Sequence, residues 1–340
     1  MRLLICTQIV DRDDPILGFF HRWVEEFAKE CESVIVICLR EGKHSLPSNV
    51  RVLSLGKESG ISRLKYLFNF YSYIWNERKQ YDAVFVHMNQ VYVLLGAPLW
   101  RLWGKHIGLW YVHRSVTMSL RLATFLVDWV FTTSPESFRI STLKRLTLGH
   151  GIDMSLFKPQ AHMASRVLSL GTVGRIAKTK NIHAMILVVE KLRLRGVEVT
   201  LSIVGSGVLP ADRVYEEDLH RLAAAHSLET VVRFEGSVTQ EALPSTYAAL
   251  DVFLNLSATG SMDKAVLEAL ACGVPVVTTN AAFKDLLLPY GLFVEGMDPG
   301  MLADAINHAR GMDITPLIEK VRMSHSLSRL IPLMTGILAH

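Results

Sequence analysis

Short apolar runs alternate with longer amphipathic stretches along almost the whole chain. In the first half, the apolar runs predict β-strands at residues 3–7, 34–39, 50–54, 83–86, 107–112 and 129–132. The stretches between them predict helices, notably at residues 17–29, 61–79 and 118–126. Strands that alternate with helices in this way are typical of an α/β domain built on a parallel sheet.

A turn-rich and polar segment at residues 150–166 interrupts the alternation, which then starts again. The second half predicts strands at residues 167–173, 199–204, 231–234, 252–255, 274–278 and 292–294, and helices at 181–194, 213–226, 240–249, 264–272 and 299–309. A last helix is predicted at 315–337. A chain of 340 residues accommodates two domains of about 150 residues each. We expect a Rossmann-like domain over residues 1–150, a second one over 151–314, and a helix within 315–340 that crosses back to the first.

The charge is distributed unevenly between the two halves. The net charge is +4, but residues 1–150 carry 19 Lys and Arg against 13 Asp and Glu, whereas the remainder carries 17 against 19. A polyphosphate or membrane partner suits the basic first half. Nucleic acid is not expected, because the chain has no dense Arg and Lys stripe interleaved with aromatic residues.

Cysteine spacing and hydropathy give expectations about the compartment. The four cysteines, Cys6, Cys31, Cys38 and Cys272, form no metal-ligand spacing and are expected to be reduced core residues of a cytoplasmic protein. The first residues lack the pattern of a signal peptide. No stretch approaches the roughly 20 consecutive apolar residues that cross a bilayer. We therefore expect a protein without a membrane-spanning helix.

A basic strand-to-helix turn forms the first candidate site. The strand at 167–173 is followed by Gly174, Arg175 and Lys180, and a helix is predicted from about residue 181. Ligands of parallel α/β sheets bind beyond the carboxyl ends of strands, where helix N-termini point their N–H groups. A guanidinium that forks onto oxygens and an ammonium point charge together neutralise a diphosphate well. The alternative is a solvated basic loop before an ordinary helix.

A polar loop and the helix after it form the second candidate site. The loop residues Gly260, Ser261, Met262, Asp263 and Lys264 follow an apolar strand and precede a helix that carries Glu268. Successive backbone N–H groups at a helix N-terminus bind anions. Glu268 stands between apolar neighbours, and its carboxylate suits a pair of vicinal hydroxyls such as those of ribose. The alternative is an ordinary surface glutamate.

Single residues at other predicted strand ends are weaker candidates. His87 and His113 end strands of the first half and suit hydrogen bonds to sugar hydroxyls; the alternative is a histidine satisfied by backbone partners. His87 and the nearby Asn89 are grouped as candidate ligand contacts at the end of one strand. Gly18 is either a packing glycine or a point of close approach for a ligand. The first strand lacks a Gly-x-Gly-x-x-Gly fingerprint, which disfavours a nicotinamide enzyme.

Five short motifs along the chain resemble those of the retaining glycosyltransferases of family 4, the glycosyl transferases group 1. They are Gly151-Ile-Asp153 with Phe157 and Pro159, Gly174-Arg175 with Lys180, Val-Gly-Ser-Gly at 204–207, Phe234-x-Gly236 with Val238, and residues 268–277 starting at Glu268. The resemblance implies a GT-B fold, in which two Rossmann-like domains place parallel sheets facing each other across a cleft. The first domain then binds the acceptor, a role that we assign to His87 and Asn89, and the second binds the nucleotide sugar.

The same resemblance implies roles for the candidate residues. Arg175 and Lys180 stabilise the leaving diphosphate, Glu268 holds the ribose, and His113 contacts the transferred sugar, which makes His113, Arg175 and Lys180 the catalytic set. The donor site also includes Gly18, Gly174, Gly205, Val238 and residues 260–264. The donor is a UDP- or GDP-linked sugar and is a substrate, and neither a metal nor a bound cofactor is expected.

Gly260 departs from the family pattern, which has its first glutamate at this position, eight residues before Glu268. Here Gly-Ser-Met-Asp at residues 260–263 replaces the usual Glu-Gly-Phe-Gly. Asp263 is a substitute carboxylate, and the backbone N–H groups of residues 261–264 remain suited to a phosphate or a sugar. This departure favours one alternative, a catalytically weakened subunit that binds nucleotide sugars. A nucleotide-sugar epimerase is a second alternative, although more acidic residues around the sugar are expected there.

A basic and aromatic stretch in the first half suggests a membrane surface. Residues 83–127 contain no Asp or Glu but include Arg101, Lys105, Arg114 and Arg121, interleaved with Trp100, Trp103 and Trp110, and residues 61–75 are rich in aromatics. Such residues suit an anionic membrane interface; the alternative is that the aromatics pack in the core or line the acceptor site. We expect a hexosyltransferase of polysaccharide biosynthesis that acts on a glycan or lipid-linked acceptor, peripheral to the inner face of the cell membrane.

Overall fold

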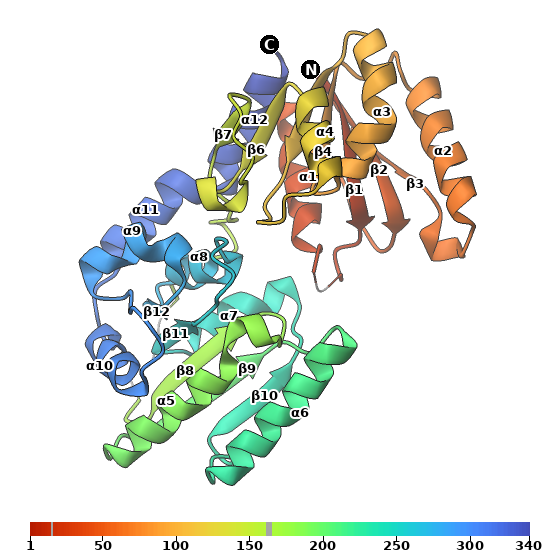
Figure 1. Ribbon diagram of the computed structural model, residues 1–340. Helices are drawn as coiled ribbons and strands as arrows, with labels where there is room; N and C mark the ends of the chain where they lie inside the picture. The colour runs from red at the N-terminus through yellow and green to blue at the C-terminus, as the bar shows by residue number, and fades with distance from the viewer. Residues whose placement is uncertain (15, 161–164) are drawn as a thin grey trace. The chain divides into compact units, whose positions relative to one another are not determined.

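The computed structural model describes residues 1–14, 16–160 and 165–340, which form two compact α/β units (Figure 1). The first unit is Met1–Asp153 with His325–His340, and the second is Met154–Ser324. These boundaries lie a few residues beyond the expected end of the first domain at 150 and ten beyond the expected end of the second at 314. Residues 161–164 of the expected linker lie outside the described residues. The expectation that the two sheets face each other across a cleft stays a prediction.

The first unit contains a seven-stranded parallel sheet in the order β3-β2-β1-β4-β5-β6-β7. Its strands are β1 (Arg2–Val10), β2 (Ser33–Glu41), β3 (Val50–Ser54), β4 (Ala83–His87), β5 (His106–Trp110), β6 (Trp129–Thr132) and β7 (Arg145–Thr147). Its helices are α1 (Phe19–Glu30), α2 (Arg63–Asn76), α3 (Gln90–Leu102), α4 (Met118–Leu126) and α12 (Leu327–Leu338). The parallel sheet is the one that the strand–helix alternation predicts.

Side chains of the central strands alternate between two hydrophobic cores. Leu4 and Cys6 pack on the side of α2, α3 and α4, whereas Leu3 and Ile5 pack on the side of α1 and α12. Successive residues of a strand point to opposite faces, so a run of apolar residues fills both cores at once. Figure 1 shows α1 beside α12, the last helix of the chain.

The end of the chain forms two helices where the sequence pattern predicts one. Helix α11 (Thr315–His325) ends at His325. The next residue, Ser326, has extended backbone and forms a parallel bridge with Ile152. The N–H of Leu327 donates to the carbonyl of Ile152 at 2.8 Å. Helix α12 then buries Leu330, Met334 and other apolar side chains against the first sheet. The break therefore turns the chain so that its last helix completes the first unit.

Two further differences concern the elements after β4 and β12. The sequence pattern does not predict α3, because this helix is apolar on most of its surface and lacks a polar stripe. The strand predicted at residues 292–294 is only an isolated bridge between Thr278 and Phe293.

Two aromatic residues of the predicted membrane surface lie inside the first unit. Trp100 and Trp110 are buried in the cores, which overturns their expected place at a membrane surface. All four cysteines are buried free thiols.

The second unit contains a five-stranded parallel sheet in the order β10-β9-β8-β11-β12. Its strands are β8 (Leu168–Val173), β9 (Val199–Val204), β10 (Val232–Gly236), β11 (Val252–Asn255) and β12 (Val276–Thr278), and its longer helices are α5 (Ile182–Leu194), α6 (Pro210–Ala225), α7 (Leu243–Ala248), α8 (Lys264–Ala271) and α10 (Pro299–Ala309).

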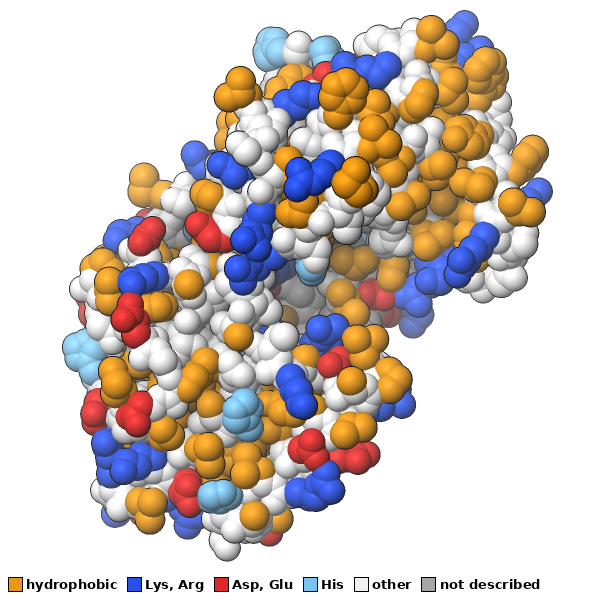
Figure 2. Space-filling view, in the orientation of Figure 1, with side chains coloured by type: hydrophobic (Ala, Val, Ile, Leu, Met, Phe, Trp, Pro, Cys, Tyr) orange, Lys and Arg blue, Asp and Glu red, His pale blue; other side chains and the backbone are white. Residues whose placement is uncertain are grey.

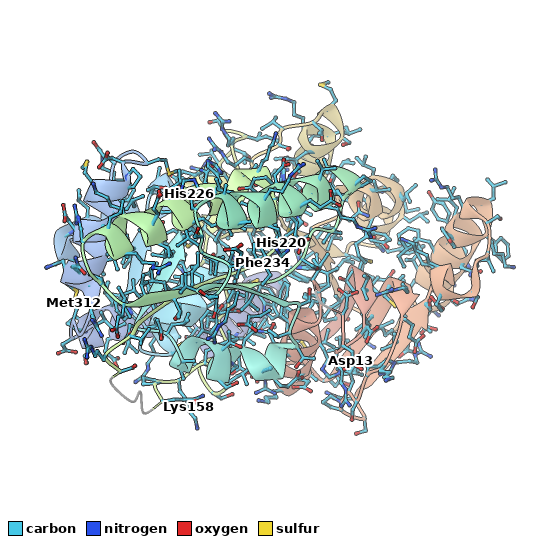
Figure 3. All side chains as sticks on the ribbon, turned by 90° about the horizontal axis from the view of Figure 1, so that it is seen from below. Asp13, Lys158, His220, His226, Phe234 and Met312 are labelled. Carbon is cyan, nitrogen blue, oxygen red and sulfur yellow. The ribbon has the colours of Figure 1, made fainter. Side chains whose placement is uncertain are left out.

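Helix α6 covers the edge of the second sheet. The ring of His220 lies over Phe234 of β10, the outer strand, with centroids 3.9 Å apart (Figure 3).

The strands of the second sheet are parallel, so the loops that follow β8, β9 and β11 lie at the same end of the sheet, before helices α5, α6 and α8. No helix among the described residues is long and apolar enough to cross a membrane.

Candidate functional site

Two glycines make the carboxyl edge of the second sheet. Gly174 follows β8 with φ 143° and Gly205 follows β9 with φ 134°, a backbone conformation that glycine adopts readily. A Cβ atom on Gly205 would lie 1.9 Å from the carbonyl oxygen of Gly174, so no larger residue fits there. A Cβ on Gly174 would meet only the side chain of Lys180, at 4.0 Å. The glycines therefore allow the ends of β8 and β9 to approach each other closely and leave open space beside Lys180.

The two predicted cations follow this turn, and each lies near a carboxylate of the same unit. The Lys180 Nζ is 2.9 Å from the Asp263 Oδ1, and both side chains are largely buried. The Arg175 Nε is 3.6 Å from the Asp212 Oδ2, with the Arg175 side chain 48% exposed. Asp212 lies in the first turn of α6 and also accepts a hydrogen bond from the Leu209 N–H at 3.1 Å. Each cation thus has a carboxylate neighbour within its own unit, and the Lys180 pair is the closer and more buried of the two.

Asp263 is fixed by contacts from both sides. Its Oδ2 accepts a hydrogen bond from the Asn255 amide at 2.8 Å, and Asn255 ends strand β11. The Thr278 hydroxyl donates to the carbonyl oxygen of Asn255 at 2.7 Å. Asp263, the expected substitute carboxylate of the Gly260 loop, is therefore held against Lys180 in this structure.

The loop around Gly260 is ordered by its own hydrogen bonds. Gly260 has φ 60°, and the Ser261 hydroxyl donates to the Thr259 hydroxyl at 3.2 Å. The Asn280 amide donates to the Ser261 carbonyl at 2.9 Å, and the Ala258 N–H donates to the Thr179 carbonyl at 2.9 Å. The loop is thereby tied to the segment that carries Lys180. Met262, Lys264 and Val238, the last of which follows β10, are half-buried at this edge of the sheet.

Glu268 is a buried residue of α8, which overturns the surface-glutamate alternative. Its side chain is surrounded by Tyr247, whose hydroxyl donates to Oε2 at 2.9 Å, and by Lys264, whose Nζ is 3.2 Å from Oε1. The Gln240 amide reaches Oε1 at 3.5 Å. The residue is 4% exposed. A buried carboxylate needs such donors, because an unpaired one would lose its hydration without compensation.

Tyr247 is a residue of the site that the sequence pattern does not single out. It is completely buried in α7, and burial, followed by the charge of Glu268, raises the pKa of its hydroxyl well above the ordinary value. The phenol therefore stays protonated and acts as a donor. No sequence signal identifies it, since a tyrosine among apolar residues is typical of a core position and its partner lies 21 positions further on.

His113 is exposed in the first unit, in the segment that follows β5. Its backbone N–H donates to the Ser137 carbonyl at 2.9 Å, and its ring Nδ1 accepts from the Ser115 N–H at 3.0 Å. A neutral ring that accepts through Nδ1 carries its proton on Nε2. His113 can thus donate a hydrogen bond to a ligand through Nε2.

His87 lies in the core of the first unit, which argues against its assignment to acceptor binding. It is 1% exposed, its ring stacks on Phe20 with centroids 4.0 Å apart, and its Nδ1 is 3.2 Å from the Thr7 hydroxyl. Burial lowers the pKa of His87 to about 3, so the ring is neutral. Strand β4 passes beneath α1 at this point, which turns its last side chain inward.

Asn89 and Gly18 have local structural roles. Asn89 caps α3 by accepting a hydrogen bond from the Val91 N–H at 3.1 Å, and its side chain also lines a cavity beside α2. A Cβ on Gly18 would lie 2.6 Å from the Asp14 carbonyl oxygen, so packing against the preceding loop explains this glycine. Asn89 therefore stays a candidate for acceptor binding. Gly18 gives no independent support for donor binding.

The described residues contain no group of three or more His, Cys, Asp and Glu side chains placed to hold a metal ion. The charges at the edge of the second sheet come instead from Arg175 and Lys180, opposite Asp212 and Asp263.

The fold is that of the GT-B glycosyltransferases, with two parallel-sheet α/β domains. The chain superposes on Anabaena Alr3699/HepE in complex with UDP with a TM-score of 0.78 at 17% identity, covering 100% of both chains. It superposes on sucrose-phosphate synthase from Thermosynechococcus elongatus with a TM-score of 0.76 at 18% identity, covering 99% and 98%. The predicted fold class is confirmed.

Within this fold, residues 168–310 match the family model of the glycosyl transferases group 1. The putative colanic acid biosynthesis glycosyltransferase WcaL of Escherichia coli is 31% identical over 136 residues, 38% of this chain and 32% of that protein. A GDP-mannose-dependent alpha-mannosyltransferase of Mycolicibacterium smegmatis is 32% identical over 151 residues, 42% and 36% of the two chains. The chain spans less than half the length of these curated relatives. The match contains Arg175, Lys180 and Glu268.

Proposed function

We propose that the protein is a glycosyltransferase that moves a hexose from a UDP- or GDP-linked sugar to a glycan or lipid-linked acceptor. The observation that carries this proposal is the arrangement of Arg175, Lys180 and Glu268 on loops and helices at one edge of the second sheet, inside the part that matches the glycosyl transferases group 1. Curated relatives named as glycosyltransferases and a similar structure that holds UDP support it.

In the proposed reaction, the acceptor hydroxyl oxygen forms a bond to the anomeric carbon on the face from which the diphosphate leaves, as the bond from that carbon to the diphosphate breaks. The hydroxyl proton passes to an oxygen of the departing diphosphate. Negative charge grows on the departing diphosphate, and Arg175 and Lys180 stabilise it with preorganised positive charge. Both cations exchange a carboxylate partner for phosphate oxygens when the donor binds. We propose that transfer proceeds with retention and without a divalent metal.

The remaining residues position the donor. Glu268 accepts hydrogen bonds from the ribose hydroxyls, and Tyr247 and Lys264 hold its carboxylate in place. Gly174 and Gly205 allow the diphosphate to approach the backbone. His113 donates from Nε2 to a hydroxyl of the transferred sugar.

Titration with nucleotides tests this function most directly. Purified protein is titrated with UDP, GDP and ADP by calorimetry, and turnover of the matching sugar nucleotides is followed by nucleotide release. We expect one nucleoside diphosphate to bind, and we expect Arg175→Ala to weaken its binding by at least tenfold and to abolish turnover. An Arg193→Ala variant, on the exposed end of α5, serves as the matched control. Binding that Arg175→Ala leaves unchanged would contradict the proposal.

A sugar-nucleotide-binding subunit is the second candidate function, and the Gly260 loop favours it. The family glutamate is missing there, and the nearest carboxylate, Asp263, is paired with Lys180. Tight binding of a nucleotide without release from any sugar nucleotide, in the presence of candidate acceptors, would establish this alternative over the transferase.

We also propose that the protein is cytoplasmic and contacts the inner face of the membrane through its first unit. Exposed apolar side chains gather on α2 (Leu64, Phe68 and Trp75) and on α4 (Met118, Leu122 and Phe125). The Lys65 ammonium lies 4.8 Å from the centre of the Phe68 ring, so positive charge accompanies the apolar surface. Flotation with anionic and neutral liposomes tests this contact, and absence of binding at low salt would exclude it.

A further inference from the structure

A cavity of about 620 Å³ opens between α2 and α3 in the first unit. Most of its lining is apolar and includes Leu55, Phe70 and Tyr92, and the polar lining is Lys57, Arg63 and Asn89. Small-molecule sites commonly enclose about 300–1,000 Å³ behind mainly apolar walls with a few placed polar groups. The cavity has the size and composition of a ligand site.

Helices α2 and α3 form the sides of this cavity, and contacts between them fix their separation. The Phe70 ring of α2 meets the Tyr92 ring of α3 with centroids 5.7 Å apart, and these two buried rings form the floor. The Tyr92 hydroxyl donates to the Thr7 carbonyl of β1 at 3.1 Å, and the Tyr71 hydroxyl donates to the Leu95 carbonyl at 3.2 Å. These bonds tie α3 to the sheet and α2 to α3.

Apolar side chains remain exposed at the rim of the cavity. Leu67 is 38% exposed and Val91 is 46% exposed, although both line a space that an apolar ligand would cover. Figure 2 shows hydrophobic side chains gathered over the region where Figure 1 places α2 and α3, with Lys and Arg among them. The exposed apolar area is therefore continuous with the cavity.

Two exposed cations, Lys57 and Arg63, belong to the polar lining of the cavity. Among the residues that the structure describes, neither Lys57 nor Arg63 forms an ion pair, whereas Arg40 of the same unit is paired with Asp14 at 2.5 Å. The carboxylate of Glu58, the residue after Lys57, accepts hydrogen bonds from the Ser54 hydroxyl at 2.6 Å and the Glu41 N–H at 3.2 Å and keeps its negative charge. An anionic group at this position would therefore meet two cations.

We propose that this cavity binds a lipid phosphate, with the apolar chain over Leu55, Phe70 and Tyr92 and the phosphate at Lys57 and Arg63. The guanidinium forks onto phosphate oxygens and the ammonium adds a point charge. The Asn89 Oδ1 accepts from the Val91 N–H, which leaves the amide nitrogen to donate to the same phosphate. The inference rests on the proposed function in one respect, because it makes the lipid phosphate the carrier of the acceptor glycan.

Calorimetry with farnesyl phosphate, below the concentration at which it forms micelles, tests the site on the full chain. We expect saturable binding, with farnesol and inorganic phosphate each binding at least tenfold more weakly, because each supplies only half of the ligand. The double variant Lys57→Glu with Arg63→Glu is expected to weaken binding at least tenfold, and Leu67→Trp to weaken it by filling the cavity from the rim.

Lys79→Glu and Asn76→Trp are the matched controls, since both residues are exposed at or just beyond the end of α2 and lie outside the cavity lining. The proposal is overturned if farnesyl phosphate does not bind, if inorganic phosphate or farnesol binds equally well, or if the control variants weaken binding as much as the cavity variants do. Binding of UDP and GDP by the same proteins is measured in parallel. If neither nucleotide binds, the proposed transferase is overturned, whereas loss of farnesyl phosphate binding alone would overturn only the cavity site.

Discussion

The ion pair between Lys180 and Asp263 sets the charge that an incoming diphosphate meets at the second sheet. In the structure, Nζ and Oδ1 are 2.9 Å apart, and Asp263 also accepts from Asn255. Asp263→Asn removes the negative charge while the new side chain keeps an oxygen for the Asn255 amide. Because a bound diphosphate has to compete with Asp263 for Lys180, we expect this variant to bind UDP more tightly than the wild-type protein.

The size of this effect follows from the burial of the pair. Two unit charges about 4 Å apart interact by about 4 kcal/mol at the effective dielectric constant of about 20 that applies near a protein surface. The side chains of Lys180 and Asp263 are 23% and 15% exposed. Screening and desolvation reduce the net worth of such pairs to about 1 kcal/mol. Since about 1.4 kcal/mol corresponds to tenfold in a dissociation constant, a gain of about 1 kcal/mol is expected to tighten UDP binding about fivefold.

Calorimetric titration of UDP at low and physiological salt measures the change. Asp304→Asn is the matched control, because Asp304 pairs with Arg195 at an exposed position of the same unit. Release of UDP from sugar nucleotides is followed separately, so that a role of Asp263 in handling the sugar would appear as slower turnover despite tighter UDP binding. If the Asp263→Asn variant unfolds at the same temperature as the wild-type protein but binds UDP equally well or more weakly, Asp263 does not compete with the diphosphate for Lys180.

Three further changes test other parts of the structure. Tyr247→Phe removes a hydrogen-bond donor from the buried Glu268, at a cost of about 1–3 kcal/mol in stability. UDP binding should weaken about tenfold, whereas binding of pyrophosphate, which has no ribose, should not. Equal weakening of both would exclude a role of Tyr247 in positioning Glu268. Gly205→Ala should lower the free energy of unfolding by at least about 2 kcal/mol, because its Cβ meets a carbonyl oxygen at 1.9 Å, whereas Gly196→Ala, with open space around it, should cost about 1 kcal/mol in urea unfolding. The pKa of His87 is about 3 in the folded protein and about 6.5 when unfolded. Between these values the unfolded state binds a proton at His87 and the folded state does not. The free energy of unfolding therefore keeps its full value above pH 6.5 and falls by about 1.4 kcal/mol per pH unit as the pH drops toward 3. His87→Phe should flatten that slope in urea unfolding between pH 7 and pH 4, and an unchanged slope would count against the burial argument.

Local patterns in the sequence determined most of the elements of both sheets. The strands at 50–54, 129–132, 199–204 and 252–255 coincide with β3, β6, β9 and β11, because buried parallel strands are short apolar runs bounded by turn residues. The spacing of Gly174, Arg175 and Lys180 was also readable, since strand, turn and helix lie within a few residues. Helix α3 could not be predicted in this way, because a helix that is apolar on most faces has no periodic signal.

Contacts between distant parts of the chain were decided only by the tertiary structure. Asp263 meets Lys180 because β8 and β11 are neighbours in the sheet, although the two residues are 83 positions apart. The fold likewise brings Tyr247 of α7 within hydrogen-bond distance of Glu268 of α8, and the ring of Phe20 on α1 stacks on His87, which makes this histidine a core residue instead of a candidate ligand. Sequence periodicity reports which face of an element is buried. The partner that covers that face is determined by strand order and helix packing, and these place side chains together regardless of their separation along the chain.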